Sequence, residues 1–233
     1  MDVLTVDIKQ AGYEERNPVI RDISFNVGAG ELVGLIGPNG AGKSTTVKSI
    51  LGLLRHVEGT IEFGGESKRY AYVPEQPVLY EYMTLWEHLQ LAAAAFGLEE
   101  QVFAERANKL LDRFRLQGDR DRLPTGFSKG MQQKMMLIIG FMLEPDIYVV
   151  DEPFVGLDPR ATRDFLALLE AERERGAGVL MSTHVLDTAE RICNRFLLVN
   201  TGSVVAQGTL DEVRDQAGCA ADAPLFDCFY ALT

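Results

Sequence analysis

The chain has 233 residues, of which 46% are hydrophobic and 24% are charged, and its formal net charge is −11. This composition excludes a disordered chain and is typical of one globular domain, or of a domain with a subdomain. The excess of acidic residues argues against non-specific binding to nucleic acids or anionic membranes, because their phosphates repel a negatively charged protein.

The cysteines and the apolar segments predict where the protein works. Cys193, Cys219 and Cys228 lack metal-site spacing and are odd in number, which indicates a reducing compartment. The N-terminus has no basic stretch followed by an apolar one, so no signal peptide is predicted. The longest apolar run, residues 135–143, is too short to cross a bilayer. We therefore expect a cytoplasmic location, with any membrane span supplied by another chain.

The first 36 residues predict β-structure. Hydrophobic and polar residues alternate in 3–8 and again in 23–27, which favours antiparallel strands. Residues 32–36 form an apolar run that is typical of a buried strand. Tyr13 lies in the loop between the first two strands, where its position suits a surface tyrosine as well as a functional one.

A glycine-rich segment, Gly37-Pro38-Asn39-Gly40-Ala41-Gly42-Lys43-Ser44-Thr45, matches the pattern G-x-x-x-x-G-K-[ST]. It stands between the apolar strand and a predicted helix over 46–54, which is the context of a phosphate-binding loop. The backbone N–H groups of such a loop surround phosphate oxygens. Lys43 would reach the β- and γ-phosphates, and the Ser44 hydroxyl would ligate Mg²⁺. The segment therefore predicts a nucleoside triphosphate site.

Two further strands are predicted over 59–65 and 70–73, and the second leads into Pro74-Glu75-Gln76-Pro77. The flanking prolines keep this loop out of a helix. A glutamine held beside a phosphate loop would help to ligate Mg²⁺ or to orient water, which is the functional interpretation of Gln76. A solvated loop amide is the alternative.

Helices interrupt the pattern over residues 77–143. Thr84 and Glu87 form a capping-box pattern, and apolar residues follow at helical spacing. A second stripe covers 103–114, and a third helix opens near Ser128 and continues through the apolar run. The methionines of this region predict packing rather than a cofactor site. We expect an inserted helical subdomain.

The residues on either side of the helical subdomain, 1–76 and 144–233, would form the core of the domain. Residues 147–150 are apolar and end in Asp151-Glu152, which places two carboxylates at a strand end, where α/β sheets bind ligands. Asp151 would hold Mg²⁺ through water. Glu152 would position or deprotonate the attacking water, an effect worth about 10²–10⁴ in rate.

In the last third of the chain, predicted helices continue to alternate with predicted strands. A helix over 160–175 follows the turn at Asp158, and a strand over 178–183 ends in His184. Because this strand end should meet those that carry Lys43 and Glu152, we interpret His184 as a hydrogen-bond donor to a γ-phosphate. A helix, a β-hairpin and a short helix are predicted next, over 185–195, 196–206 and from 210, and then an irregular tail, 217–233.

Six motifs fall in order along the chain: the phosphate loop, Gln76, Ser128-Lys129-Gly130-Met131, Asp151-Glu152, Leu157-Asp158 and His184. Together they resemble the ATP-binding subunit of ABC transporters over nearly the whole chain. The resemblance implies an α/β P-loop ATPase fold with an N-terminal antiparallel β region and the inserted helical subdomain. It also implies ATP and Mg²⁺ as cofactors, and ATP hydrolysis as the activity.

The same resemblance assigns roles near the nucleotide. Nucleotide binding would involve Tyr13, stacked on the adenine, and the residues from Gly37 to Thr46. Mg²⁺ would be held by Ser44, Gln76 and Asp151. The catalytic residues would be Lys43, Gln76, Glu152 and His184, and Gln76 would also couple the nucleotide to a permease.

A head-to-tail dimer is implied as well, with two ATP molecules between subunits of one or two types. Ser128 and the N–H of Gly130 in one subunit would touch the γ-phosphate held by the other. Asp158 would order the dimer seam. In this family the helix at this position usually begins with Ser-Gly-Gly-Gln, whereas here it begins with Ser128-Lys129-Gly130-Met131. The Lys129 side chain would point either to the phosphate or to solvent.

Four segments resemble the Ecs-type group of ABC-2 transporters, namely 74–81, 127–134, 151–159 and 179–184. This resemblance implies a separate membrane-spanning permease, export of its cargo, and a location on the inner face of the membrane through that permease. Two alternatives remain. A soluble ABC ATPase acting on ribosomes or DNA is disfavoured by the single cassette and the acidic charge. A regulatory module that does not hydrolyse ATP is disfavoured because Lys43 and Glu152 are both present.

Overall fold

The computed structural model describes all 233 residues, and its N-terminal part is a three-stranded antiparallel sheet in the order β2-β1-β4. The strands are β1 (Asp2–Gly12), β2 (Ile20–Gly28) and β4 (His56–Phe63). Buried and exposed residues alternate along β1, so that Leu4, Val6 and Ile8 face the interior. The alternation seen in the sequence therefore reflects a sheet with one buried face.

A six-stranded sheet forms the centre of the molecule, in the order β5-β6-β7-β3-β8-β9. Its strands are β3 (Leu32–Ile36), β5 (Tyr70–Val73), β6 (Ile147–Asp151), β7 (Gly178–Thr183), β8 (Arg195–Asn200) and β9 (Ser203–Gly208). All neighbours are parallel except β8 and β9. The strands β3, β6 and β7 are buried along their whole length, which explains why they are apolar except for Asp151, Ser182 and Thr183 at the C-terminal ends of β6 and β7.

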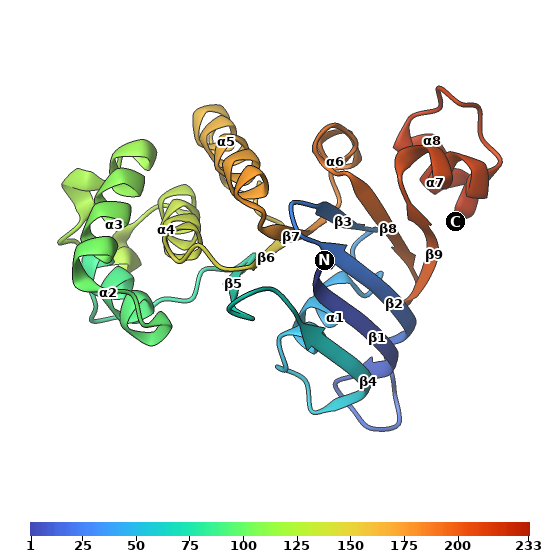
Figure 1. Cartoon of the computed structure of the whole chain (residues 1–233), viewed down its shortest axis with the longest axis horizontal. Coiled ribbons are helices and arrows are strands. Elements are labelled where there is room, and N and C mark those ends of the chain that lie inside the picture. Colours follow the sequence, from blue (N-terminus) through green and yellow to red (C-terminus); the bar gives the residue numbers. More distant parts are fainter.

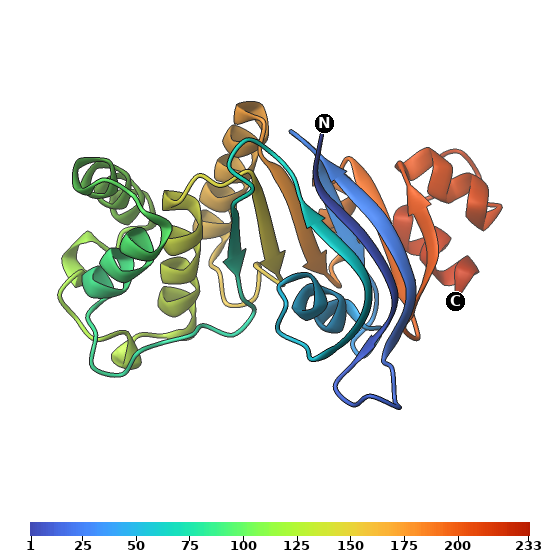
Figure 2. The same ribbon diagram turned by 60° about the horizontal axis from the view of Figure 1, so that its bottom comes forward.

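Helix α1 (Lys43–Ile50) lies between the two sheets (Figure 2). One apolar cluster joins residues of both sheets to Val47 and Ile50 of this helix. The helix begins and ends earlier than the predicted 46–54. It begins directly after Gly42, whose φ of 107° ends the loop, and it is followed by Gly52 at φ 69°. Such left-handed conformations favour glycine and stop a helix.

The inserted helices are α2 (Leu85–Phe96), α3 (Glu100–Phe114) and α4 (Lys129–Met142), and they extend from one end of the molecule (Figure 1). Both hydrogen bonds of the predicted capping box between Thr84 and Glu87 are present. Met135, Met136 and Met142 are buried in an apolar cluster that also contains residues of β5, β6 and α5, which confirms their packing role. Helix α4 thus connects the inserted helices to the central sheet.

The C-terminal residues differ from the predicted irregular tail. After α5 (Pro159–Arg175) and α6 (Leu186–Ile192), the chain ends in the helices α7 (Leu210–Ala217) and α8 (Leu225–Leu232). Leu225 and Cys228, three positions apart on α8, are fully buried in a third apolar cluster. The prediction was wrong because α8 is short and begins at Pro224, without a side-chain cap. These two helices lie at the end opposite α2 and α3 (Figure 1).

One smaller difference concerns α6. Helix α6 covers seven residues, fewer than the predicted 185–195, because β8 already begins at Arg195. None of the helices has the length and apolar character required to cross a membrane.

Candidate active site

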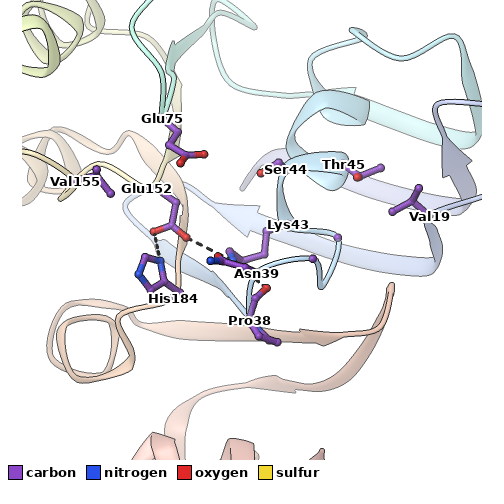
Figure 3. A pocket seen from close by; sticks show the side chains of 12 residues that line it. Val19, Pro38, Asn39, Lys43, Ser44, Thr45, Glu75, Glu152, Val155 and His184 are labelled. Carbon is purple, nitrogen blue, oxygen red and sulfur yellow. Dashed lines mark hydrogen bonds and ion pairs between the residues drawn. The ribbon is translucent and has the colours of Figure 1, made fainter. Parts of the chain in front are cut away.

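The C-terminal ends of β3, β6 and β7 meet at one edge of the central sheet. The parallel register pairs Asp151 with Ser182 and Ile36 with Thr183, so the residues that follow these strands lie side by side. A cavity of about 260 Å³ opens at this edge (Figure 3). Twelve residues line it: Val19, Pro38, Asn39, Gly40, Gly42, Lys43, Ser44, Thr45, Glu75, Glu152, Val155 and His184.

The phosphate loop supplies seven of these twelve residues. Gly40 and Gly42 have φ values of 83° and 107°, which side-chain-bearing residues rarely adopt, and they curl the backbone around the start of α1. The buried Lys43 ammonium donates to the carbonyl oxygens of Gly37 at 2.8 Å and of Pro38 at 3.3 Å. The loop therefore holds its lysine at the N-terminus of a helix, where an anion is attracted.

Glu152 lies between Lys43 and His184. Its Oε1 atom is 3.5 Å from the Lys43 ammonium, and its Oε2 atom is 2.9 Å from Nδ1 of His184 (Figure 3). Oε1 is buried and has no hydrogen-bond partner. Because a buried carboxylate oxygen without a hydrogen bond is costly even beside a cation, this atom is ready to accept a proton or a hydrogen bond from a bound molecule.

The backbone at Glu152 is strained. Its φ of 45° places a non-glycine residue in the left-handed region, at a cost of about 1–3 kcal/mol. The backbone N–H of Glu152 donates to the carbonyl oxygen of Ser182 at 3.1 Å, which holds this conformation. The side chain is thereby turned from the end of β6 into the cavity.

Asp151, which precedes Glu152 in the chain, is 4% exposed and accepts a hydrogen bond from the Ser182 hydroxyl. Burial raises the pKa of Asp151, and the Ser182 hydrogen bond opposes this effect. The neighbouring carboxylates of Glu75 and Glu152 raise this pKa further, whereas Lys43 lowers it. A carboxyl group in such surroundings gains from a cation placed beside it.

The donor set suits Mg²⁺ rather than a transition metal. Asp151, Ser44 and Glu75 offer carboxylate and hydroxyl oxygens, which are the ligands that Mg²⁺ prefers. No group of three or more His, Cys, Asp and Glu side chains is arranged to hold a metal by itself. This agrees with the usual Mg²⁺ sites of nucleotide-binding proteins, which use one or two carboxylates together with phosphates and water.

The loop after β5 places a different residue in the cavity from the one predicted. Glu75 belongs to the lining and points into the cavity (Figure 3). Gln76 does not belong to the lining, and both residues are exposed. Strand β5 ends at Val73 and the chain bends at Glu75 and Gln76, so the alternation of a strand does not extend to these two residues. Glu75 was not predicted, because its place in the cavity depends on this bend.

Several predicted nucleotide-binding residues stand behind the lining. Gly37, Ala41 and Thr46 are buried, and the Thr46 hydroxyl donates to the carbonyl oxygen of Gly42 at 3.0 Å. Tyr13 is 55% exposed beside α1, with its hydroxyl 3.4 Å from the Lys48 ammonium. These residues shape or border the loop, and Val19, Val155 and Ser182 join the site without having been predicted.

The residues predicted to act across a dimer lie elsewhere. Ser128 is exposed and caps α4, where it accepts a hydrogen bond from the Met131 N–H at 3.3 Å. Lys129 is exposed on the first turn. Asp158 caps α5 and forms an ion pair with Lys134 at 2.7 Å, and these two contacts lower its pKa. None of these residues lines the cavity.

The family profile described as ABC transporter matches residues 20–155 of the chain. The ABC transporter ATP-binding protein YthP of Bacillus subtilis (strain 168) is 53% identical over 229 residues, which are 98% of this chain and 96% of YthP. The ABC-type transporter ATP-binding protein EcsA of the same strain is 45% identical over 242 residues, covering 100% of this chain and 97% of EcsA. The predicted resemblance to this family, including the Ecs-type group, is confirmed.

A solved structure of the ATP-binding subunit of an ABC transporter superposes on the chain with a TM-score of 0.93. It covers 99% of both chains at 45% sequence identity. The α/β P-loop ATPase fold is confirmed with it. ATP-binding subunits of this kind dimerise and work with membrane permeases. The chain therefore belongs to the ABC transporter family, as an ATP-binding subunit that hydrolyses ATP.

Proposed function

We propose that two subunits of this kind pair head to tail around two molecules of ATP and Mg²⁺, and that hydrolysis drives a separate permease that exports its cargo. One observation carries the proposal. The cavity contains the phosphate loop, Glu152 and His184, but it is open and receives no residue from the start of α4. Ser128 instead presents the N-terminus of α4 to solvent, which leaves it free to complete the cavity of another subunit.

The chemistry follows from the three side chains that converge. The phosphate-loop N–H groups and Lys43 hold the phosphates, and they stabilise the charge that develops on the γ-phosphoryl oxygens. The oxygen of a water molecule forms a bond to the γ-phosphorus while the bond from this phosphorus to the β,γ-bridging oxygen breaks. One proton of the water passes to Oε1 of Glu152, and ADP and inorganic phosphate are released. His184 keeps the carboxylate in place through Oε2. Mg²⁺, held by Ser44 and Asp151, would neutralise phosphate charge.

Glu75 lines the cavity, whereas the predicted Gln76 does not. We expect Glu75→Ala to lower ATP hydrolysis by the isolated subunit by about 10–100-fold, as is typical for loss of a group that supports a metal site. Gln76→Ala should change it less than about threefold, because Gln76 is exposed and is not part of the cavity lining. Steady-state phosphate release at varied Mg²⁺ checks both. Equal losses would contradict the assignment to Glu75.

Two further observations support export and the permease contact. A relative that is 31% identical over 225 residues, LptB of Haemophilus influenzae, is by name the ATP-binding protein of a lipopolysaccharide export system. On this chain, Val78, Tyr80 and Tyr82 are 63%, 54% and 90% exposed in the loop after Gln76. Large apolar side chains so exposed favour contact with another protein. We infer that the permease binds at this loop.

Mixing two inactive variants tests the composite site. Lys43→Ala damages the phosphate loop, and Ser128→Glu sets a negative charge against the phosphate held by the partner. In a heterodimer of the two, one site combines an intact Lys43 with an intact Ser128. An equal mixture should recover about a quarter of wild-type activity, because half of the dimers carry one good site out of two. Measured phosphate release that stays at the level of each variant alone would refute the shared site.

A further inference from the structure

A second cavity, of about 360 Å³, lies outside the site described above, where α3, α4 and α5 meet. Eight residues line it: Arg113, Phe114, Arg115, Lys134, Asp158, Arg160, Ala161 and Asp164. Four of the eight are cations, in a chain whose net charge is −11. This volume falls within the range of small-molecule sites.

The acidic residues of the lining do not neutralise these cations. Asp158 pairs with Lys134 at 2.7 Å, and Asp164 pairs with Arg160 at 3.7 Å. The guanidinium groups of Arg113 and Arg115 form no ion pair and no hydrogen bond with the rest of the chain, although the Arg115 backbone N–H donates to the carbonyl oxygen of Asp112 at 3.1 Å. The cavity therefore keeps two positive charges in excess, and a bound dianion would balance them. Helix dipoles add little, since α3 ends and α5 begins here.

The backbone at Arg115 is unfavourable for an arginine. Helices α2, α5 and α7 each end in a glycine with positive φ, at Gly97, Gly176 and Gly218. Helix α3 has Arg115 at the equivalent position, with a φ of 59°. A side chain in this conformation is strained, and glycine would be preferred for the fold alone. An arginine at this position, with its side chain lining the cavity, therefore suits a role other than folding.

We propose that this cavity binds a small phosphorylated molecule, with its phosphate dianion held by Arg113 and Arg115. Guanidinium groups suit phosphate because they donate two parallel hydrogen bonds to its oxygens. The ligand is a free molecule rather than a lipid headgroup, because the net charge of the chain repels an anionic membrane surface.

The position of the cavity links it to the predicted dimer seam, a consequence that rests on the proposed function. A phosphate in the cavity competes with Asp158 for Lys134. The loop before Asp158 touches the start of α4, since a Cβ atom on Gly130 would lie 2.5 Å from the carbonyl oxygen of Gly156. The ligand thereby acts on the segment that carries Ser128, and its concentration regulates how readily two subunits pair on ATP.

Calorimetric titration of the full chain with pyrophosphate, and separately with inorganic phosphate, tests the binding step. The nucleotide site is first saturated with a non-hydrolysable ATP analogue and Mg²⁺. We expect one pyrophosphate per subunit, and at least about tenfold weaker binding by Arg113→Ala and by Arg115→Gly, as for other charge-assisted hydrogen bonds. Arg163→Ala is the matched control, because Arg163 is an exposed arginine of α5 outside the cavity.

Arg115→Gly separates binding from folding. Because glycine relieves the left-handed strain, this variant should melt no lower than the wild type while its pyrophosphate binding is lost. Wild-type affinity in Arg115→Gly, an equal loss in Arg163→Ala, or no binding by the wild type would each overturn the proposal. Binding confined to vesicles that contain phosphatidic acid would also overturn it. The titration is independent of the mixing experiment, so the two proposals fail separately.

Discussion

Glu152→Gln is expected to lower ATP hydrolysis by about 10²–10⁴-fold and to leave ATP trapped in a dimer. The amide has nearly the same shape as the carboxylate, so it keeps the place between Lys43 and His184. It cannot take a proton from water, and the reaction stops before the γ-phosphate is cleaved. Loss of the negative charge beside Lys43 also removes a repulsion against the bound phosphates, which favours the ATP-bound state.

Phosphate release and light scattering with and without ATP measure the two effects of this substitution. The variant should elute as a dimer with Mg²⁺ and ATP and as a monomer without them. Glu174→Gln is the control, since Glu174 is exposed on α5 and forms no ion pair. Near-normal phosphate release by Glu152→Gln would remove Glu152 from the role of general base.

Lys43→Ala is expected to weaken ATP binding by at least about tenfold and to lower turnover by about 10²-fold or more, because charge-assisted contacts to phosphate are lost. The Lys43 ammonium is 6% exposed and already lies at the floor of the cavity. Its removal leaves Glu152 buried without a cation, so a lower melting temperature is also expected.

Fluorescent-nucleotide titration and phosphate release at saturating ATP separate the binding effect from the turnover effect. Lys109→Ala serves as the control, because Lys109 is exposed on α3 and far along the chain from the loop. Unchanged nucleotide affinity in Lys43→Ala would contradict the assignment of residues 37–45 to phosphate binding. A folding defect would be recognised from the melting curve measured on the same samples.

Local patterns carried most of the prediction. Three features depend only on neighbouring residues and are formed as predicted: the phosphate loop, the capping box at Thr84 and the apolar run before Asp151. Such features depend on contacts within a few residues, for which sequence spacing is a sufficient guide. The roles of Tyr13, Gln76 and Lys129 stay predictions, because these side chains lie on the surface of the chain.

The sequence predicted less where the outcome depends on distant partners. Glu75 lines the cavity together with Glu152 and His184, and its place there depends on the bend that follows β5. Helix α8 forms because Leu225 and Cys228 find an apolar surface on α6, α7 and β8, not because of its own eight residues.

By itself, the sequence predicted Lys43 for the phosphates, Asp151 for Mg²⁺ and Glu152 for the attacking water, and it determined the family to which the chain belongs. The tertiary structure decided how these residues are used. It set Glu152 between Lys43 and His184, brought Glu75 into the cavity, and left Ser128 on a separate face. The physical reason is that a side chain's type is local, whereas its distance to residues more than a hundred positions away follows from strand order and register.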